Sequence, residues 1–285
     1  MFRILRNCVA ALVVAGITVG FGAQPAQAIA YGENARDGAY PFSVLLTMTG
    51  LPTPDHGTRD SSCSGALIAP RWVVTAGHCF RDASGRRVSE PVARRTTATI
   101  GRVKVNGRGG HVTDVVGVHQ SETADVALAE LDEAVTGVAF LRVGTTPPSP
   151  GESVRLTGFG LTAGSVPATR LQTGRFTVDR VGDSLLEISG RAPKDDTSPC
   201  PHDSGGPYFR EDRSGPPVLV AVVSAGPSCP HTGADLGART DNVSDWITAT
   251  TTGSSSRAPV AFIVAGMVAA LLAVVAVLLW RRTAR

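Results

Sequence analysis

The sequence predicts an all-β domain, a barrel or a sandwich, between residues 29 and 247. Short runs of β-prone residues recur along this region, and glycine, proline, asparagine, aspartate or serine separates them. Near its end, the stretch 242–249 is suited to one short helix. Examples of the predicted strands are residues 42–47, 66–68, 72–75, 126–131, 154–157, 176–178 and 218–223.

A proline-rich stretch divides this domain. Residues 144–151 contain Pro147, Pro148 and Pro150, and prolines so close together mark a connector. We therefore expect two halves joined near this point, within a domain of residues 29–248. Residues 249–259 are rich in threonine, serine and glycine and predict a flexible stalk.

The first 28 residues have the order of a secretory signal peptide. Arg3 and Arg6 precede an apolar run over residues 9–22, and Ala26-Gln27-Ala28 matches an A-x-A cleavage site. The alternative is an uncleaved N-terminal anchor, for which the apolar run is short. We expect residues 1–28 to direct export and to be removed.

Residues 260–280 predict one transmembrane helix. They contain no charged residue, and as a helix they would span about 31 Å, close to the hydrocarbon thickness of a bilayer. The arginines in residues 281–285 belong on the cytoplasmic side, which places the domain outside the cell membrane. Two alternatives are a buried core helix, which is rarely apolar on every face, and a cell-wall sorting signal, whose cleavage motif residues 250–253 fit poorly.

Charge argues against a nucleic-acid partner. Five of the 27 basic residues lie in the two terminal segments, which leaves 22 basic against 24 acidic residues elsewhere. No clustered basic face of the kind that binds nucleic acid follows from this balance.

The cysteines predict disulfides. Cys8 lies in the signal segment, and the exported part keeps an even number in an oxidising compartment, for which three pairings exist. No C-x-x-C pair is present, so we expect no structural zinc site. The four exported cysteines are Cys63, Cys79, Cys200 and Cys229.

Three longer motifs carry a resemblance to a known family. They are SGALIAPRWVVTAGHC over residues 64–79, ADVAL over residues 124–128 and CPHDSGGP over residues 200–207. Smaller matches are GFG at 158–160, SAG at 224–226 and VSDWI at 243–247. In this order they resemble the chymotrypsin/trypsin-like serine proteases, in particular a secreted, bacterial-type member, across residues 29–247.

The resemblance implies two packed, antiparallel, six-stranded β-barrels with a short C-terminal helix and a catalytic cleft between the barrels. It places His78 and Asp125 on the first half and Ser204 on the second. A serine hydroxyl is a weak nucleophile, so Ser204 needs His78 to take its proton, while Asp125 holds the imidazole in the required tautomer. The chain order His, Asp, Ser differs from that of subtilisins and α/β-hydrolases.

The implied activity is endopeptidase hydrolysis of proteins or peptides through an acyl-enzyme, without a metal or an organic cofactor. The resemblance also pairs Cys63 with Cys79, and Cys200 with Cys229 across the substrate pocket. The histidines without a matching motif are predicted to be solvated or structural, and they are His56, His111, His119 and His231.

The sequence departs from the family at the oxyanion hole. Relatives place glycine two residues before the nucleophile, where its N–H acts together with that of the serine; here His202 precedes Ser204 in this way. A residue with a Cβ resists the required dihedrals, and loss of one donor costs about 3 kcal/mol, or 100-fold in rate. The alternative function is therefore a weak or inactive protease-fold module that binds peptides at the membrane.

The substrate pocket departs from trypsin-like members. Its floor is uncharged, and open walls beside it favour apolar or aromatic side chains over arginine or lysine. A shifted loop carrying Asp195 or Asp196 is the alternative source of an acid. The residues that the resemblance places in the pocket are Ser198, Ser224, Gly226 and Gly237.

A last expectation concerns activation. In the family, a new N-terminal isoleucine or valine inserts its ammonium beside the acid that precedes the nucleophile, which here is Asp203. Ile29 directly follows Ala28, so signal peptidase itself would expose this amine. The alternative is cleavage a few residues away, followed by trimming.

Overall fold

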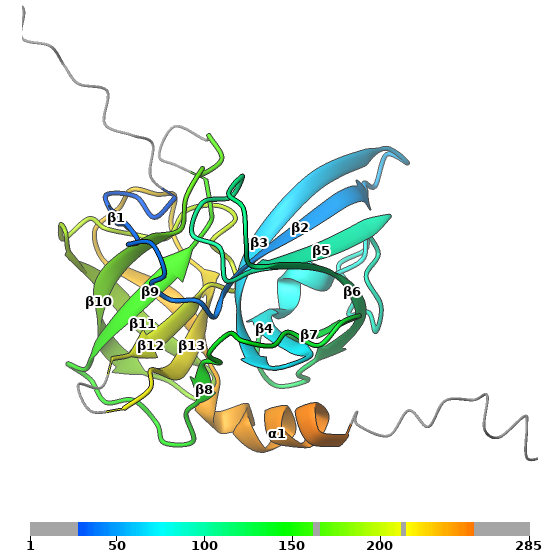
Figure 1. Cartoon of the computed structure of the whole chain (residues 1–285). Helices are drawn as coiled ribbons and strands as arrows, with labels where there is room; N and C mark the ends of the chain where they lie inside the picture. Colours follow the sequence, from blue (N-terminus) through cyan, green and yellow to red (C-terminus); the bar gives the residue numbers. More distant parts are fainter. Residues whose placement is uncertain (1–27, 162–165, 212–214, 254–285) are drawn as a thin grey trace, which may run out of the picture.

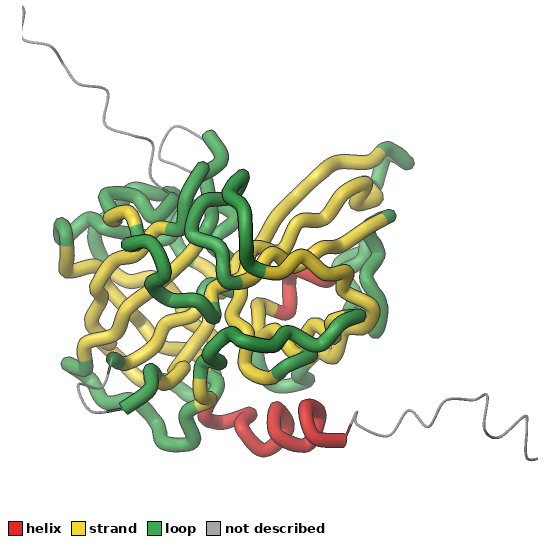
Figure 2. The backbone as a smooth tube through the Cα atoms, viewed as in Figure 1, coloured by secondary structure: helices red, strands yellow, loops and turns green. Residues whose placement is uncertain are grey.

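The computed structural model describes residues 28–161, 166–211 and 215–253. These residues form two β-barrels that lie side by side, with one helix beneath them (Figure 1). Strands and loops make up nearly all of both barrels (Figure 2). The predicted signal peptide up to residue 27, most of the stalk, the transmembrane helix and the basic tail lie outside the described residues.

The first barrel is a closed ring of six antiparallel strands in the order β2-β3-β4-β7-β6-β5. Two neighbouring strands of its wall, β4 and β7, are buried at every residue, including the whole run VALAEL of β7. Its strands are β2 (Ser43–Pro52), β3 (Thr58–Ala69), β4 (Trp72–Ala76), β5 (Arg95–Ile100), β6 (His111–Gln120) and β7 (Val126–Leu131).

The second barrel also closes with six antiparallel strands, because β9 pairs with both β10 and β12 in the order β9-β10-β11-β14-β13-β12. Two short strands, β1 (Glu33–Asn34) and β8 (Arg142–Val143), pair with its outside. Its strands are β9 (Ser153–Gly158), β10 (Gln172–Val181), β11 (Leu185–Ala192), β12 (Pro207–Arg210), β13 (Val218–Ala225) and β14 (Ala234–Arg239).

The predicted all-β fold of two six-stranded barrels is therefore confirmed, and each of the seven predicted strand runs lies in or against a strand of the structure. Residues 144–151, the predicted connector, form the loop between β8 and β9. A shared hydrophobic core joins the barrels, since Phe42 and Leu67 of the first cluster with Phe209 and Leu219 of the second.

Two disulfides reinforce the loops around the cleft. Cys63 pairs with Cys79, and Cys200 pairs with Cys229, which is the pairing that the resemblance implied. The first bridge closes a loop with a sequence separation of 16 residues. In the chain-entropy account, a loop of this size stabilises the fold by about 3 kcal/mol.

The C-terminal helix α1 spans Ser244–Gly253, and Ile247 packs it against the hydrophobic core that the two barrels share. The sequence predicted a helix over residues 242–249 and a stalk from residue 249. That boundary needs correction, because residues 249–253 are helical; burial of Ile247 anchors the turns that follow it. Within the described part of the chain, no helix has the length and apolar character needed to cross a membrane.

Candidate active site

Three separate elements bring the predicted catalytic residues to the cleft. His78 lies on the short 3₁₀ helix η1 (Gly77–Phe80), directly after the buried strand β4. Asp125 immediately precedes β7, the strand that pairs with β4. Ser204 lies in the loop between β11 and β12 of the second barrel. The cleft is therefore assembled from both barrels.

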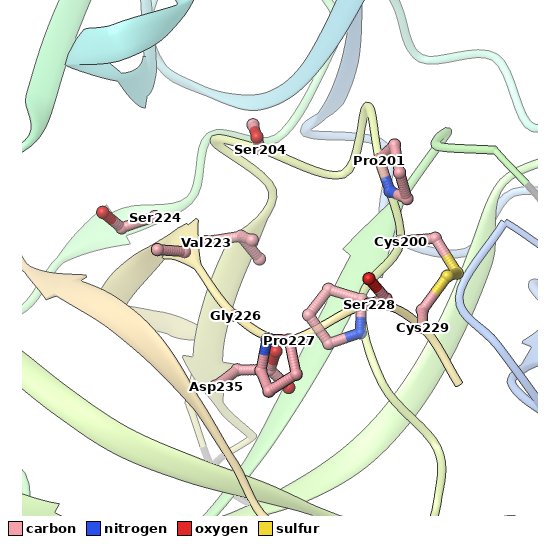
Figure 3. A pocket seen from close by; sticks show the side chains of 12 residues that line it. Cys200, Pro201, Ser204, Val223, Ser224, Gly226, Pro227, Ser228, Cys229 and Asp235 are labelled. Carbon is pink, nitrogen blue, oxygen red and sulfur yellow. A yellow bond between two sulfur atoms is a disulfide. The ribbon is translucent and has the colours of Figure 1, made fainter. Parts of the chain in front are cut away.

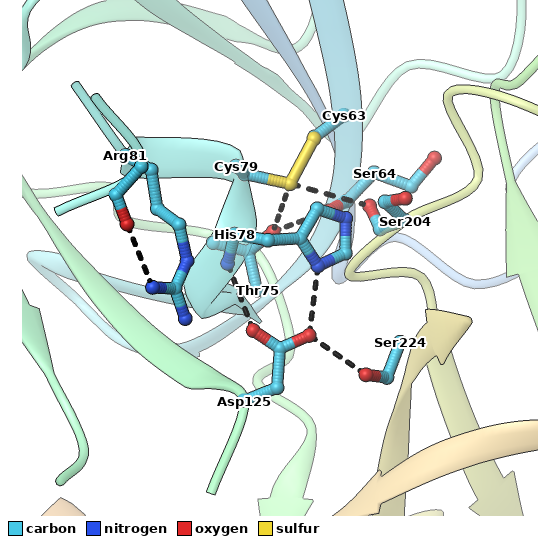
Figure 4. Close-up of polar contacts among 10 residues, drawn as sticks. Cys63, Ser64, Thr75, His78, Cys79, Arg81, Asp125, Ser204 and Ser224 are labelled. Carbon is cyan, nitrogen blue, oxygen red and sulfur yellow. Dashed lines mark hydrogen bonds and ion pairs between the residues drawn. A yellow bond between two sulfur atoms is a disulfide. The ribbon is translucent and has the colours of Figure 1, made fainter. Parts of the chain in front are cut away.

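His78 and Asp125 form a close pair. The Nδ1 atom of His78 lies 2.7 Å from Oδ2 of Asp125, and the backbone N–H of His78 donates to Oδ1 at 2.8 Å (Figure 4). The Ser224 hydroxyl also donates to Oδ2 of Asp125, at 2.7 Å. A Cβ on Gly77 would lie 3.0 Å from Oδ1 of Asp125, so glycine leaves room for the carboxylate. Because the carboxylate accepts from Nδ1, Nε2 of His78 is left to act as a base.

These donors keep Asp125 ionised. Burial alone would raise the pKa of this carboxyl, but the hydrogen bonds from His78 and Ser224, with the charge of His78, outweigh it and hold the pKa below its usual value. An ionised partner is what stabilises an imidazolium during proton transfer. The sequence placed Ser224 in the substrate pocket; the structure adds its hydrogen bond to Asp125.

The loop that carries Ser204 is held tightly against the first barrel. The N–H of Ser64 donates to the carbonyl oxygen of Ser204 at 2.9 Å. The next residue, Gly205, has φ +80°, and a Cβ there would lie 1.9 Å from the Thr75 hydroxyl oxygen. Only glycine fits this position without displacing the chain. Ser204 consequently has a defined place, and it shares the lining of one cavity with His78.

His202 adopts the backbone conformation that the sequence analysis expected a Cβ to resist. Its φ is +75°, in the left-handed region. Contacts of its ring hold it there: Nδ1 lies 2.8 Å from the hydroxyl oxygen of Ser62 and 3.1 Å from its backbone nitrogen. Among the described residues, no acceptor pairs with the backbone N–H of His202 or of Ser204. Both donors of the predicted oxyanion hole are therefore free.

A cavity of about 490 Å³ opens beside Ser204 (Figure 3). Ser224, Gly226 and the Cys200–Cys229 disulfide form part of its wall, together with the apolar side chains of Val223 and Pro227. Two of the predicted pocket residues do not belong to this lining. Ser198 is buried outside the lining, and the space beside Gly237 is filled by Ile188, Ala221 and Tyr208.

The sequence predicted an uncharged pocket floor, and the structure adds an acid, Asp235, to the cavity lining. A Cβ on Gly226 would lie 2.0 Å from Oδ1 of Asp235, so the missing side chain of Gly226 admits this carboxyl. Neither Asp195 nor Asp196, the acids that the sequence analysis weighed, lines the cavity. No local signal could have revealed Asp235, because the strand that carries it, β14, was not among the predicted runs.

His231, which was predicted to be solvated or structural, lies in a buried hydrogen-bonded pair. Its Nε2 lies 3.1 Å from Oδ1 of Asp235, and its side chain is only 10% exposed. Burial raises the pKa of Asp235 to about 6, although the charge and hydrogen bond of His231 act in the opposite direction. The described residues thus contain a second histidine–carboxylate pair, of which Asp235 lines the cavity beside Ser204.

Asp203 is fully buried and has no cationic partner among the described residues. Its carboxylate accepts from the N–H of Gly160 at 2.8 Å and of Cys200 at 2.9 Å. Burial raises its pKa to about 8 against these hydrogen bonds, and the charge of Asp235 adds to the rise. Ile29 is buried too, but its nitrogen is still in the peptide bond to Ala28. The predicted ion pair therefore stays a prediction for the cleaved chain.

The two-barrel fold, with a serine, a histidine and an aspartate meeting between the barrels, is that of a serine protease domain. A comparison with protein families matches residues 29–247 to the Trypsin family. The chain belongs to that family.

Two curated relatives agree with this placement. The chain is 30% identical over 224 residues, 70% of its length, to Suppressor of tumorigenicity 14 protein homolog from Bos taurus. It is 25% identical over 226 residues, 72% of its length, to Ovochymase from Halocynthia roretzi. The matched regions are 25% and 14% of those relatives, so the chain spans a quarter or less of their length.

Proposed function

We propose that this protein is a serine endopeptidase that hydrolyses peptide bonds through an acyl-enzyme. The observation that carries the proposal is the 2.7 Å contact between Nδ1 of His78 and Oδ2 of Asp125, at a cavity that His78 shares with Ser204. A third donor, the Ser224 hydroxyl, keeps the carboxylate fixed in position. This arrangement activates a serine without any further group.

In the proposed reaction, Oγ of Ser204 attacks the scissile carbonyl carbon while Nε2 of His78 takes its proton. The imidazolium that forms is stabilised by the ionised Asp125, and it then protonates the leaving amine. Water enters, gives a proton to His78 and attacks the acyl-enzyme. His78 finally returns that proton to Ser204, so the free acid leaves and the enzyme is restored.

The negative charge on the carbonyl oxygen would be met by the backbone N–H groups of His202 and Ser204. Each such donor contributes about 3 kcal/mol to transition-state stabilisation. The hydrogen bonds of the His202 ring to Ser62 support a backbone that glycine adopts in relatives. This support favours activity over the alternative of an inactive binding module.

The side chain before the scissile bond would enter the cavity beside Ser204, whose walls of Val223, Pro227 and a disulfide suit an apolar or aromatic group. The proposal also includes the cellular setting: export through residues 1–28, and retention at the cell membrane by residues 260–280 with the domain outside. Protease added to intact cells should release the domain, whereas its protection would contradict this topology.

A fluorophosphonate probe tests the proposal, because it reacts only with an activated serine. The parent protein should be labelled at Ser204 and should hydrolyse a peptide substrate. Ser204→Ala should keep the fold and lose both properties, while Ser61→Ala, a change in a nearby strand serine, should keep both. An unlabelled but folded parent protein that still binds peptides would favour the binding module.

A further inference from the structure

Asp235 is placed to set the charge of the substrate cavity. Figure 3 shows Ser204 and Asp235 at opposite ends of the cavity, with the chain at Gly226 between them. The side chain of Asp235 is 1% exposed, and its Oδ2 atom has no hydrogen-bond partner among the described residues. A buried, unpartnered carboxyl oxygen is costly and favours a bound donor.

His231 is the hydrogen-bond partner of this carboxyl. Nδ1 of His231 lies 3.3 Å from the carbonyl oxygen of Thr232, and Nε2 lies 3.1 Å from Oδ1 of Asp235. A carbonyl oxygen and an ionised carboxylate only accept, so both contacts are hydrogen bonds when His231 is doubly protonated or when Asp235 itself carries the facing proton. In both arrangements the pair is neutral overall.

Two further titratable groups face Asp235. Asp203 comes from the nucleophile loop and Tyr208 from β12, and burial together with the charge of Asp235 raises the pKa of each. The other packed elements contribute uncharged groups, Ile188 of β11 and Gly226 after β13. His231 is thus the group that supplies a positive charge to Asp235 among the described residues.

We propose that the proton shared by His231 and Asp235 selects the substrate: the cavity takes an uncharged side chain while the pair keeps this proton, and a lysine or arginine side chain once it is lost. The inference rests on the proposed endopeptidase function and specifies its substrate class. Loss of the proton leaves a net charge of −1 in a buried cavity, where an ammonium or guanidinium replaces it.

The transition falls near pH 6, because burial raises the pKa of Asp235 to about 6 against the opposing effect of His231. Below this pH the cavity is neutral, and its apolar walls favour an uncharged substrate side chain. Above it, the carboxylate attracts a basic side chain. A bound basic side chain also displaces the proton, so it shifts the transition to lower pH.

Two peptides that differ only in leucine or lysine before the scissile bond test the inference with the full-length protein. The ratio of kcat/KM for lysine over leucine should rise at least tenfold between pH 5 and pH 8. Because a change in the catalytic residues affects both substrates alike, the ratio removes its contribution. A ratio that stays constant with pH in an active enzyme overturns the inference.

Substitutions at Asp235 and His231 test whether the proton that controls the preference lies on this pair. Asp235→Asn should keep a low ratio at every pH, since it cannot ionise. His231→Gln should keep the rise but move it to higher pH, because His231 lowers the pKa of Asp235. Asp195→Asn removes an exposed acid of the loop leading to the nucleophile and should reproduce the parent profile. An Asp235→Asn enzyme with the parent profile would overturn the assignment.

A binding measurement separates this inference from the proposed function. The Ser204→Ala protein should bind 4-aminobenzamidine, a small aromatic amidinium, at least tenfold more tightly at pH 8 than at pH 5, and Asp235→Asn should remove the difference. If the parent neither cleaves nor reacts with fluorophosphonate but shows this step, the function fails and the inference stands. An active parent without the step gives the reverse result.

Discussion

Two histidine–carboxylate pairs each contribute one residue to a cavity that Ser204 lines, and the pairs have opposite properties. In the first, Asp125 receives three donors, from the backbone and ring of His78 and from Ser224. In the second, Asp235 has one hydrogen-bond partner, His231, and keeps an unpartnered oxygen. The pKa of Asp125 is lowered, whereas that of Asp235 is raised to about 6.

The difference shows that the surroundings of a carboxyl determine its role. The side chain of Asp125 is 20% exposed and that of Asp235 is 1% exposed. Loss of water raises a carboxyl pKa, and each donor lowers it again. The carboxyl with more donors stays ionised and can support proton transfer by a base, while the carboxyl with fewer donors takes up a proton and can report pH.

The largest effect expected from this comparison is that of Asp125→Asn. An amide donates to Nδ1 or forces the wrong tautomer, so kcat should fall by a factor on the order of 10⁴. Asp235→Asn should keep most of the activity toward a leucine substrate. Steady-state kinetics on both variants measure this difference, and equal losses would show that the two pairs are not distinct in role.

Asp203 extends the comparison to a buried carboxyl without a histidine. Its pKa of about 8 lies well above the unfolded value near 4. In a chain that keeps Ala28, the free energy of unfolding is therefore highest below about pH 4. It falls by a few kcal/mol as the pH rises toward 8, because the folded state must then give up the proton of Asp203. A chain that starts at Ile29 should lack this loss, because its ammonium pairs with ionised Asp203.

Thermal unfolding of both forms at pH 5 and pH 8 checks this prediction. The form with Ala28 should lose more stability between these values than the form that starts at Ile29. Asp203→Asn should make the two forms alike and should remove the activity that the ion pair supports. Identical pH dependence of the two unsubstituted forms would contradict the ion pair.

Ser224→Ala tests how strongly the number of hydrogen-bond donors determines the pKa of Asp125 and its support of catalysis. Removing a hydrogen bond to a charged group costs about 1.5 kcal/mol or more, so kcat should fall about tenfold while KM changes little. The pKa of Asp125 should rise toward the behaviour of Asp235. Ser224→Thr, which keeps the hydroxyl, should restore most of the rate; an unaffected Ser224→Ala enzyme would remove this serine from the account.

The smallest effect is expected for His202→Gly. Unlike His78 and His231, His202 contacts the backbone and hydroxyl group of Ser62 and no carboxylate. Glycine takes φ +75° without strain and keeps the N–H of the oxyanion hole. The rate should therefore stay within a few-fold of the parent. His202→Ala keeps the strain and loses the contacts with Ser62, so it should unfold at a lower temperature than His202→Gly.

Much of the fold could be predicted from the sequence, because the local pattern of apolar residues indicates its clearest strands. The run VALAEL over Val126–Leu131 is apolar enough to be buried on both faces, and it is. Strands β11 and β14 were not among the predicted runs, since glycine and charged residues interrupt LLEISGRA and ADLGAR. Pairing with neighbouring strands supplies the order that their own residues do not indicate.

The candidate site likewise has a part that the sequence could predict and a part that it could not. Motifs around His78, Asp125 and Ser204 are local, so the family resemblance that they carry could predict their meeting point. The substrate cavity depends on contacts that are distant in sequence. Asp235 and Gly237 project from the same face of β14, because side chains alternate along a strand. The residues themselves do not indicate which of these two positions, 235 or 237, belongs to the cavity lining.

The sequence by itself thus determined the two-barrel class, the disulfide partners implied by the resemblance and the residues proposed for catalysis, because each depends on short, contiguous patterns. Only the tertiary structure decided the charge of the cavity and the backbone at His202. The pairing of β14 with β13 and the missing side chain at Gly226 bring Asp235 into the lining. Contacts with Ser62 on β3 hold His202 in its left-handed conformation. Both depend on strand register and on loops from two barrels, which packing across the whole domain settles.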